Sequence, residues 1–165
     1  MQEKVREIAF TKVALPYGWL GNMSPYPIRH LEREWRTSEA LFQALRFDDE
    51  QIRELIRSQK GPMAAKMVAK GRRDSMVIAP MSAADVENMR LCLRLKLDQH
   101  PGLKQQLLAI SDARIIEDAS ARGRSASSLF WGAVRVDGGW EGENMLGELW
   151  MKRCEELIAE KRPEA

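Results

Sequence analysis

The stretch Trp35-Arg36-Thr37-Ser38-Glu39-Ala40-Leu41-Phe42-Gln43-Ala44-Leu45-Arg46-Phe47 is the part of the sequence around which the chain is organised. Thr37 or Ser38 can cap a helix, because apolar residues recur behind them at helical spacing. Glu39 then falls in the first turn, where the helix dipole favours a carboxylate. These residues alone favour a helix-start acid. They leave open a second interpretation, in which the apolar face of the helix holds Glu39 at the wall of a pocket.

The composition limits the class of protein. A chain of 165 residues suffices for one domain, and we expect a single domain over residues 1–165 with its core at about residues 8–160. The 26 basic residues nearly balance the 24 acidic ones, so the net charge of +2 does not by itself indicate a nucleic acid or membrane partner. Cys92 and Cys154 have no metal-site spacing and are predicted to be core thiols in a reducing compartment.

The pattern of apolar residues predicts a mostly helical α+β domain with a few short strands. The N-terminal residues carry charges of both signs, and no apolar run is long enough for a signal peptide or a membrane span, so the sequence predicts a cytoplasmic protein. Residues 119–128 are polar and small and predict a loop, and the charged tail from Lys161 is expected to fray. Strands are expected at 8–15, 28–35 (a pair) and 113–117, and helices at 38–47, 50–58, 62–70, 83–99, from 101 and from 145.

Residues 16–27 form an irregular segment with three prolines and two glycines. This segment carries four large side chains, Tyr17, Trp19, Met23 and Tyr26. Such a loop either packs onto the core or lines a binding site, and its composition does not decide between the two.

Several kinds of chemistry find no motif in this sequence. It contains no phosphate-binding glycine loop, dinucleotide fingerprint, nucleophile elbow or zinc cluster, and no cofactor is implied. The residues that remain suit a pocket that stacks a planar ring between aromatic side chains and binds polar atoms with carboxylates. Cleavage of an N-glycosidic bond needs such groups. They are Glu39, Lys66, Glu117, Asp118, Asn144 and the aromatic residues of the loops at Tyr17–Tyr26 and Phe130–Trp131.

Five segments match one known family in order and in spacing. They are GNMSPYPI (residues 21–28), WRTSEALFQA (35–44), KLDQHP (96–101), FWG (130–132) and GENMLG (142–147). Together they resemble the NADAR family, also called YbiA-like, over nearly the whole chain. The resemblance implies a compact, helix-rich α+β fold with one polar pocket and N-glycosidase activity. Some members hydrolyse ribosylamine phosphate intermediates of riboflavin synthesis. Others remove ADP-ribose from guanine bases in nucleic acid and so reverse DarT-type toxins.

The resemblance also implies roles for individual residues. Glu39 matches the family's site carboxylate, and Lys66 matches a family lysine that would allow an imine with an opened ribose. The catalytic residues that we predict are Glu39, Lys66 and Asp118, and the predicted substrate-binding residues are Trp19, Asn22, Met23, Arg122, Trp131 and Asn144. No metal is included.

Two departures from the family's riboflavin-type members argue against the riboflavin-type activity. Those members carry an acid three residues before the aromatic that Trp131 matches, where this chain has Ser128, and a tryptophan where this chain has Met81. Asp118 or Glu117 would have to replace the acid. The leading prediction is therefore removal of ADP-ribose from guanine in DNA or RNA, with a genetically linked ADP-ribosyltransferase toxin as a further partner and no membrane partner. The alternatives are hydrolysis of a ribosylamine phosphate and a binding module for ADP-ribose or NAD that performs no catalysis.

Overall fold

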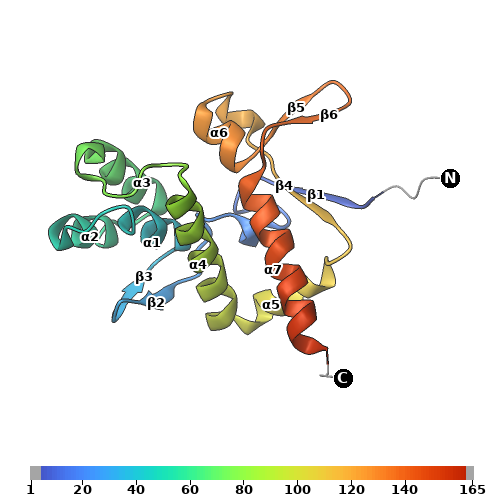
Figure 1. Cartoon of the computed structure of the whole chain (residues 1–165), viewed down its shortest axis with the longest axis horizontal. Helices are drawn as coiled ribbons and strands as arrows, with labels where there is room; N and C mark the ends of the chain where they lie inside the picture. The colour runs from blue at the N-terminus through green and yellow to red at the C-terminus, as the bar shows by residue number, and fades with distance from the viewer. Residues whose placement is uncertain (1–4, 163–165) are drawn as a thin grey trace. The chain divides into compact units, whose positions relative to one another are not determined.

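The computed structural model describes residues 5–162 of the chain (Figure 1). Expectations about the two charged ends that concern residues 1–4 and 163–165 lie outside this range. The chain divides into two compact units, described separately below. Unit 1 comprises Met1–Gly21 and Pro101–Ala165, and unit 2 is the continuous stretch Asn22–His100. The expectation of one domain over the whole chain stays a prediction.

Unit 2 combines a β-hairpin with a group of helices. Its elements are β2 (Ile28–His30), β3 (Arg33–Trp35), α1 (Ser38–Ala44), α2 (Glu50–Arg57), α3 (Pro62–Gly71), the 3-10 turn η2 (Arg73–Ser75) and α4 (Ala83–Gln99). The helix α1 packs against α2, α3 and α4, and α4 also packs against β2. Because of this central position, all seven residues of α1 are buried, including Glu39. The hairpin predicted within residues 28–35 is confirmed, with Ile28 opposite Trp35.

Side-chain caps explain why the helices of unit 2 begin where they do. Thr37 Oγ1 accepts a hydrogen bond from the backbone N–H of Ala40 at 3.1 Å, which confirms the predicted start of α1. Asp49 caps α2 in the same way, and Ser82 caps α4. Pro62 occupies the first turn of α3, where a missing N–H costs no helical bond.

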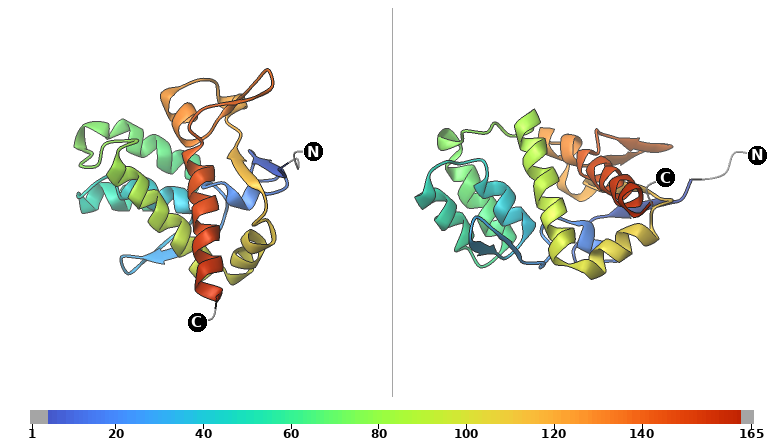
Figure 2. Two further views of the ribbon diagram at one scale, coloured as in Figure 1. Left: turned by 45° about the vertical axis from the view of Figure 1, so that its right-hand side comes forward. Right: turned by 60° about the horizontal axis from the view of Figure 1, so that its bottom comes forward.

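Unit 1 brings together the two ends of the sequence. Its elements are β1 (Glu7–Phe10), the 3-10 turn η1 (Gly18–Leu20), α5 (Pro101–Ala109), β4 (Arg114–Glu117), the 3-10 turn η3 (Ser120–Arg122), α6 (Ala126–Trp131), β5 (Val134–Val136), β6 (Gly139–Glu141) and α7 (Met145–Lys161). The strands β1 and β4 pair in parallel, and β5 and β6 form a hairpin. The long helix α7 packs against β4, α5 and α6, and Figure 2 shows α5 beside α7 in both views.

Two sequence-based expectations for unit 1 need correction. The strand predicted over residues 8–15 ends at Phe10, because the chain turns directly afterwards. The loop predicted over residues 119–128 contains η3 and the start of α6. The small polar composition of this segment reflects capping: Ser125 Oγ accepts from the backbone N–H of Ser128 at 3.1 Å.

The fold class is the predicted one, α+β and mostly helical with a few short strands. Within residues 5–162, no helix is long and apolar enough to cross a membrane.

Candidate active site

Glu39 lies in the first turn of α1 with only 7% of its surface exposed. Its Oε2 accepts a hydrogen bond from Asn22 Nδ2 at 2.8 Å, and its Oε1 accepts one from Gln43 Nε2 at 2.8 Å. Two predicted site residues, Glu39 and Asn22, are thus brought into direct contact. Both carboxylate oxygens of Glu39 therefore accept from N–H donors, which fix the position of the carboxylate.

The orientation of the Asn22 amide is fixed by Ser38. Ser38 Oγ donates to Asn22 Oδ1 at 2.5 Å, so the amide nitrogen of Asn22 points to Glu39. The backbone N–H of Glu39 also donates to the carbonyl oxygen of Asn22 at 3.0 Å. These bonds fasten the loop that begins at Asn22 to the N-terminus of α1.

The same loop is fastened to α4 by a buried lysine. Lys96 Nζ donates to Ser24 Oγ at 2.7 Å and lies 5.3 Å from the ring centre of Tyr26. Burial lowers the pKa of Lys96 to about 7. At the end of α4, the ring of His100 meets Tyr26 edge to face, and its Nε2 lies 2.6 Å from the carbonyl oxygen of Pro27. The irregular segment is therefore tied down within unit 2 from Asn22 to Pro27.

A buried thiol lies one helical turn before Lys96. Cys92 has no exposed surface. Its burial, together with the nearby charges of Glu39 and Asp85, raises the pKa of the Cys92 thiol. This thiol is consequently held in its neutral form beside the carboxylate.

Two further predicted residues belong to unit 2. Lys66 is half-buried on α3, next to Ala65, whose side chain is buried, and α3 packs against α1. Met23 is half-buried in the loop between Asn22 and Ser24. The catalytic role of Lys66 and the binding role of Met23 stay predictions.

In unit 1, Asn144 holds the start of α7 against β4. Its Nδ2 donates to the carbonyl oxygen of Ile115 at 2.8 Å, and its Oδ1 accepts from the backbone N–H of Glu117 at 2.9 Å. Asn144 adopts the left-handed conformation, with φ 52°, which asparagine tolerates better than most residues. The side chain of Asn144 therefore positions the end of β4. A role of Asn144 in binding substrate stays a prediction.

The acids that follow β4 contact arginines of the same unit. Glu117 Oε1 lies 2.6 Å from Arg122 Nη2. Asp118 is half-buried; its Oδ1 accepts from the backbone N–H of Ser120 at 3.0 Å, and its Oδ2 lies 3.8 Å from Arg135 Nε. Arg122 is exposed, as a phosphate-binding residue would need to be, but it is paired with Glu117 rather than with Asp118.

The predicted aromatic residues of unit 1 each contact another ring. Trp131, at the end of α6, meets Phe130 edge to face at 4.9 Å between ring centres and is 8% exposed. Trp19, in η1, meets Trp150 of α7 at 6.0 Å in the same geometry. Ser128, where an acid was expected from the riboflavin-type members, is buried and accepts a hydrogen bond from Ser125 Oγ at 3.0 Å.

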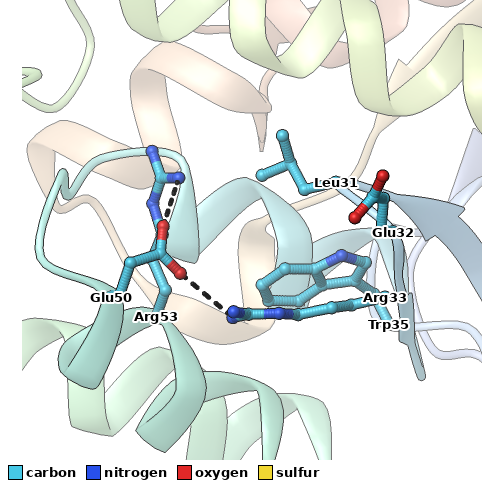
Figure 3. Close-up of a pocket in the computed structure, with 6 residues that line it drawn as sticks. All are labelled: Leu31, Glu32, Arg33, Trp35, Glu50 and Arg53. Carbon is cyan, nitrogen blue, oxygen red and sulfur yellow. Dashed lines mark hydrogen bonds and ion pairs between the residues drawn. The ribbon is translucent and has the colours of Figure 1, made fainter.

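Unit 2 also contains a pocket of about 470 Å³ beside the tip of the hairpin (Figure 3). It is lined by Leu31, Glu32, Arg33, Trp35, Glu50 and Arg53, none of which is a predicted site residue. Figure 3 shows the carboxylate of Glu50 reaching both Arg33, at 3.1 Å, and Arg53, at 3.4 Å. Burial and the charge of Arg53 lower the pKa of nearby His30, which therefore adds little positive charge to this region.

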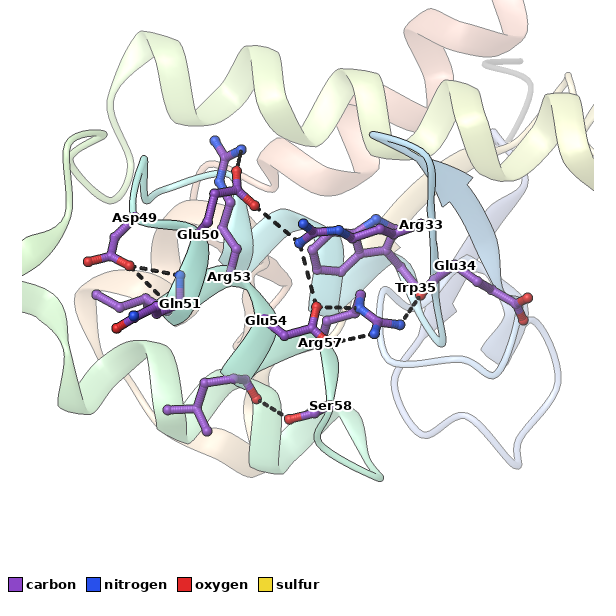
Figure 4. Close-up of polar contacts among 12 residues, drawn as sticks. Arg33, Glu34, Trp35, Asp49, Glu50, Gln51, Arg53, Glu54, Arg57 and Ser58 are labelled. Atoms are coloured by element: carbon purple, nitrogen blue, oxygen red, sulfur yellow. Dashed lines mark hydrogen bonds and ion pairs between the residues drawn. The ribbon is translucent and has the colours of Figure 1, made fainter.

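The same arginines belong to a surface network along α2. Arg57 donates to both oxygens of Glu54, from Nε at 2.8 Å and from Nη2 at 2.5 Å, and Arg33 approaches Glu54 at 3.5 Å (Figure 4). The hydrogen bond from Arg57 lowers the pKa of Glu54. These side chains remain partly exposed, so the network contributes little to stability.

The structure resembles the NMR structure of the Escherichia coli protein YbiA, with a TM-score of 0.77 at 33% identity over 98% of this chain and 90% of that chain. It therefore has the YbiA-like α+β fold. The family model of the NADAR domain matches residues 9–158, and the chain belongs to the NADAR family.

Three relatives have names that state an activity or a pathway. The N-glycosidase YbiA of Escherichia coli is 35% identical over 162 residues, which cover 98% of this chain and 93% of the relative. The N-glycosidase Npun_R5314 of Nostoc punctiforme is 29% identical over 91% of this chain and 92% of the relative. The riboflavin biosynthesis protein VVA0006 of Vibrio vulnificus is 33% identical over 86% of this chain but only 36% of its own length.

Proposed function

We propose that this protein is an N-glycosidase that removes ADP-ribose from guanine bases of nucleic acid. The observation that carries the proposal is the buried carboxylate of Glu39, which accepts an amide N–H at each oxygen within unit 2. The relatives that are named N-glycosidases support the reaction class.

The reaction is a hydrolysis. The bond between ribose C1′ and the guanine nitrogen breaks, and its electron pair leaves with the nitrogen. Positive charge develops on C1′ and the ring oxygen, and water supplies the hydroxyl group for C1′ and the proton for the base. An ionised carboxylate stabilises such a cation or takes a proton from the attacking water. Glu39 suits these roles, because N–H donors of unit 2 hold both of its carboxylate oxygens in place.

In this proposal a second group supplies the proton for the leaving base. Asp118 is the acid that we propose for this step, and water is the alternative source. Lys66 is retained as the candidate for an imine with the opened sugar. For the phosphates we propose Arg122, whose guanidinium is exposed, and for ring stacking Trp19 and Trp131. Asn22, Met23 and Asn144 complete the proposed set.

The choice of ADP-ribosylated guanine over a smaller substrate rests on Ser128. This residue stands where riboflavin-type members carry an acid, and its side chain is buried and bonded to Ser125. A serine hydroxyl cannot replace a carboxylate as an acid catalyst near neutral pH.

A second candidate function is hydrolysis of a ribosylamine phosphate. The observation that favours it is the 33% identity to the Vibrio vulnificus riboflavin biosynthesis protein. Both candidates break an N-glycosidic bond, so they share the requirement for Glu39 and differ in the group that leaves.

The test presents both substrate classes to the same enzyme. Guanine-ADP-ribosylated DNA and RNA oligonucleotides and a ribosylamine phosphate are incubated with wild type, Glu39→Gln and Glu34→Gln, and the products are followed by mass spectrometry. Glu34 is an exposed acid near Glu39 in the sequence and serves as the control. We expect wild type and Glu34→Gln to release ADP-ribose, and Glu39→Gln to lose activity by roughly 10²–10⁴-fold.

The other outcomes of this assay would support a different function or a different catalytic group. Cleavage of the ribosylamine phosphate alone would establish the second candidate. Intact substrates at high enzyme concentration, together with tight calorimetric binding of ADP-ribose, would show a binding module. Full activity in Glu39→Gln would remove Glu39 from the mechanism.

A further inference from the structure

A buried ion pair lies on the side of Gln43 opposite Glu39. Arg46 Nε and Nη2 donate to Asp85 Oδ1 and Oδ2, each at 2.8 Å. Arg46 is 8% exposed and Asp85 is not exposed at all. Removing both charges from water is costly, and an apolar pair of similar volume is often as stable. Stability alone therefore does not explain why this ion pair is buried.

The third donor of Arg46 fixes the orientation of an amide. Arg46 Nη1 donates to Gln43 Oε1 at 3.1 Å. A guanidinium group can only donate, so the oxygen of Gln43 must face Arg46 and the nitrogen must face Glu39. Gln43 Nε2 accordingly lies 2.8 Å from Glu39 Oε1. Asp85, Arg46, Gln43 and Glu39 thus form one directed chain of buried hydrogen bonds.

The other end of this chain reaches the turn before α4. Asp85 Oδ2 also accepts from the backbone N–H of Met81 at 2.8 Å, and the N–H of Asp85 is capped by Ser82 at 3.2 Å. Met81 has φ 64°, a left-handed conformation that is strained for a side chain of this kind. Asp85 therefore holds a strained turn and Arg46 at the same time, which leaves the carboxylate little freedom to reorient.

We propose that Arg46 and Asp85 are positioning residues for Glu39: through Gln43 they keep one amide N–H aimed at its carboxylate, which holds that carboxylate in one rotamer. This inference rests on the proposed function, because it assumes that Glu39 acts on the substrate. Neither Arg46 nor Asp85 needs to touch the substrate for this role.

The first measurement needs no substrate. In ¹H–¹⁵N spectra of the whole protein, the side-chain NH₂ of Gln43 should show slow exchange with solvent. The reason is that the Gln43 side chain is hydrogen-bonded to Glu39 at its nitrogen and to Arg46 at its oxygen. Asp85→Asn keeps an oxygen for the Met81 N–H but weakens the hold on Arg46, and it should speed this exchange. The control is Glu54→Gln, which removes one carboxylate from the surface pair with Arg57 in the same unit (Figure 4) and should leave the Gln43 signal unchanged.

The second measurement is kinetic. Gln43→Met keeps both partners of the Arg46–Asp85 pair, and it removes the donor to Glu39 together with the acceptor of Arg46 Nη1. We expect both Gln43→Met and Asp85→Asn to lower kcat by roughly 10- to 100-fold with KM changed little, since a misplaced catalytic group costs rates of this order. Glu54→Gln should keep the wild-type kcat. Thermal unfolding of each variant establishes that it is folded at the assay temperature.

The outcomes separate the two proposals. If wild type cleaves no substrate, the proposed function fails, and the exchange measurement still tests the positioning. Equal Gln43 exchange in wild type and Asp85→Asn, or a Gln43→Met enzyme with wild-type kcat, overturns the positioning. If Asp85→Asn does not fold, Gln43→Met alone decides the kinetic question.

Discussion

Lys96 Nζ donates a hydrogen bond to Ser24 Oγ at 2.7 Å from a position with no exposed surface. The bond joins α4 to the loop whose first residue, Asn22, holds Glu39. Burial lowers the pKa of this lysine from 10.5 to about 7. The site loop is therefore anchored by an amine that is largely uncharged in weakly alkaline solution.

This anchor predicts how stability depends on pH. The unfolded chain keeps the Lys96 proton up to its ordinary pKa of 10.5, whereas the folded protein releases it at a pKa of about 7. Between these values the unfolded state binds more protons, so the free energy of unfolding rises with pH, by up to about 1.4 kcal/mol per unit from this group. Below pH 7 the contribution is constant and unfavourable.

Urea unfolding at pH 7.5, 8.0 and 8.5 measures the effect, in a range below the ordinary thiol pKa. Wild type should gain stability with pH, and Lys96→Met should lose most of that slope. The exposed lysine variant Lys70→Met should behave like wild type. Identical slopes in wild type and Lys96→Met would contradict the prediction.

Glu39→Gln should destabilise the folded protein as well as reduce its activity. Asn22 and Gln43 both present N–H groups to residue 39, and a glutamine there would place its own NH₂ against one of them. We expect a loss of about 1–3 kcal/mol, because a buried donor would be left without an acceptor. Calorimetry measures it, with the exposed Glu34→Gln as control. Equal stabilities of the two variants would show that the amides can reorient.

Both cysteines should resist thiol reagents in the folded protein. Burial raises the pKa of Cys92, an effect that Glu39 and Asp85 reinforce, and burial also raises that of Cys154, together with Glu155. A neutral, buried thiol is a poor nucleophile. Titration with a disulfide reagent at pH 7.5 should therefore detect no fast-reacting thiol until a denaturant is added, after which both react. A rapid reaction of one equivalent in the folded protein would count against this environment.

Gly147→Ala should disturb the seat of α7 on β4. An added Cβ would lie 2.2 Å from the carbonyl oxygen of Ile115 and 2.5 Å from the Asn144 amide. We expect a loss of about 1–3 kcal/mol or more from this overpacking. The control is Gly102→Ala in α5, where nothing lies within 4 Å of the added atom and a gain of roughly 0.5–1 kcal/mol is expected. Thermal unfolding of both variants provides the comparison, and a stable Gly147→Ala would mean that β4 can shift.

Local signals account for what the sequence could predict. Thr37, Pro62 and Ser82 act on backbone groups close to them in the chain, so the starts of their helices were predictable. Ser125 acts in the same local way, but it lies among other small polar residues, whose composition predicts a loop rather than a helix cap. Glu39 was found from its place behind the cap together with the family resemblance.

The partners of Glu39 were harder to predict, for a physical reason. Gln43 lies four residues after Glu39 on the same helix, and this spacing could have revealed it. Asp85 is 39 residues from Arg46, and Lys96 is 72 residues from Ser24. Such contacts depend on how α4 packs, which no local pattern contains.

The division of the sequence between the two units has a consequence for synthesis on the ribosome. The strand β1 pairs with β4, which lies beyond the whole of unit 2 in the sequence. The chain is synthesised from its N-terminus, so residues 22–100 can begin to fold before β4 has been made. During this time β1, with its apolar residues Ile8 and Phe10, has no strand to pair with. The nascent protein therefore passes through a stage in which the apolar residues of β1 have no partner strand.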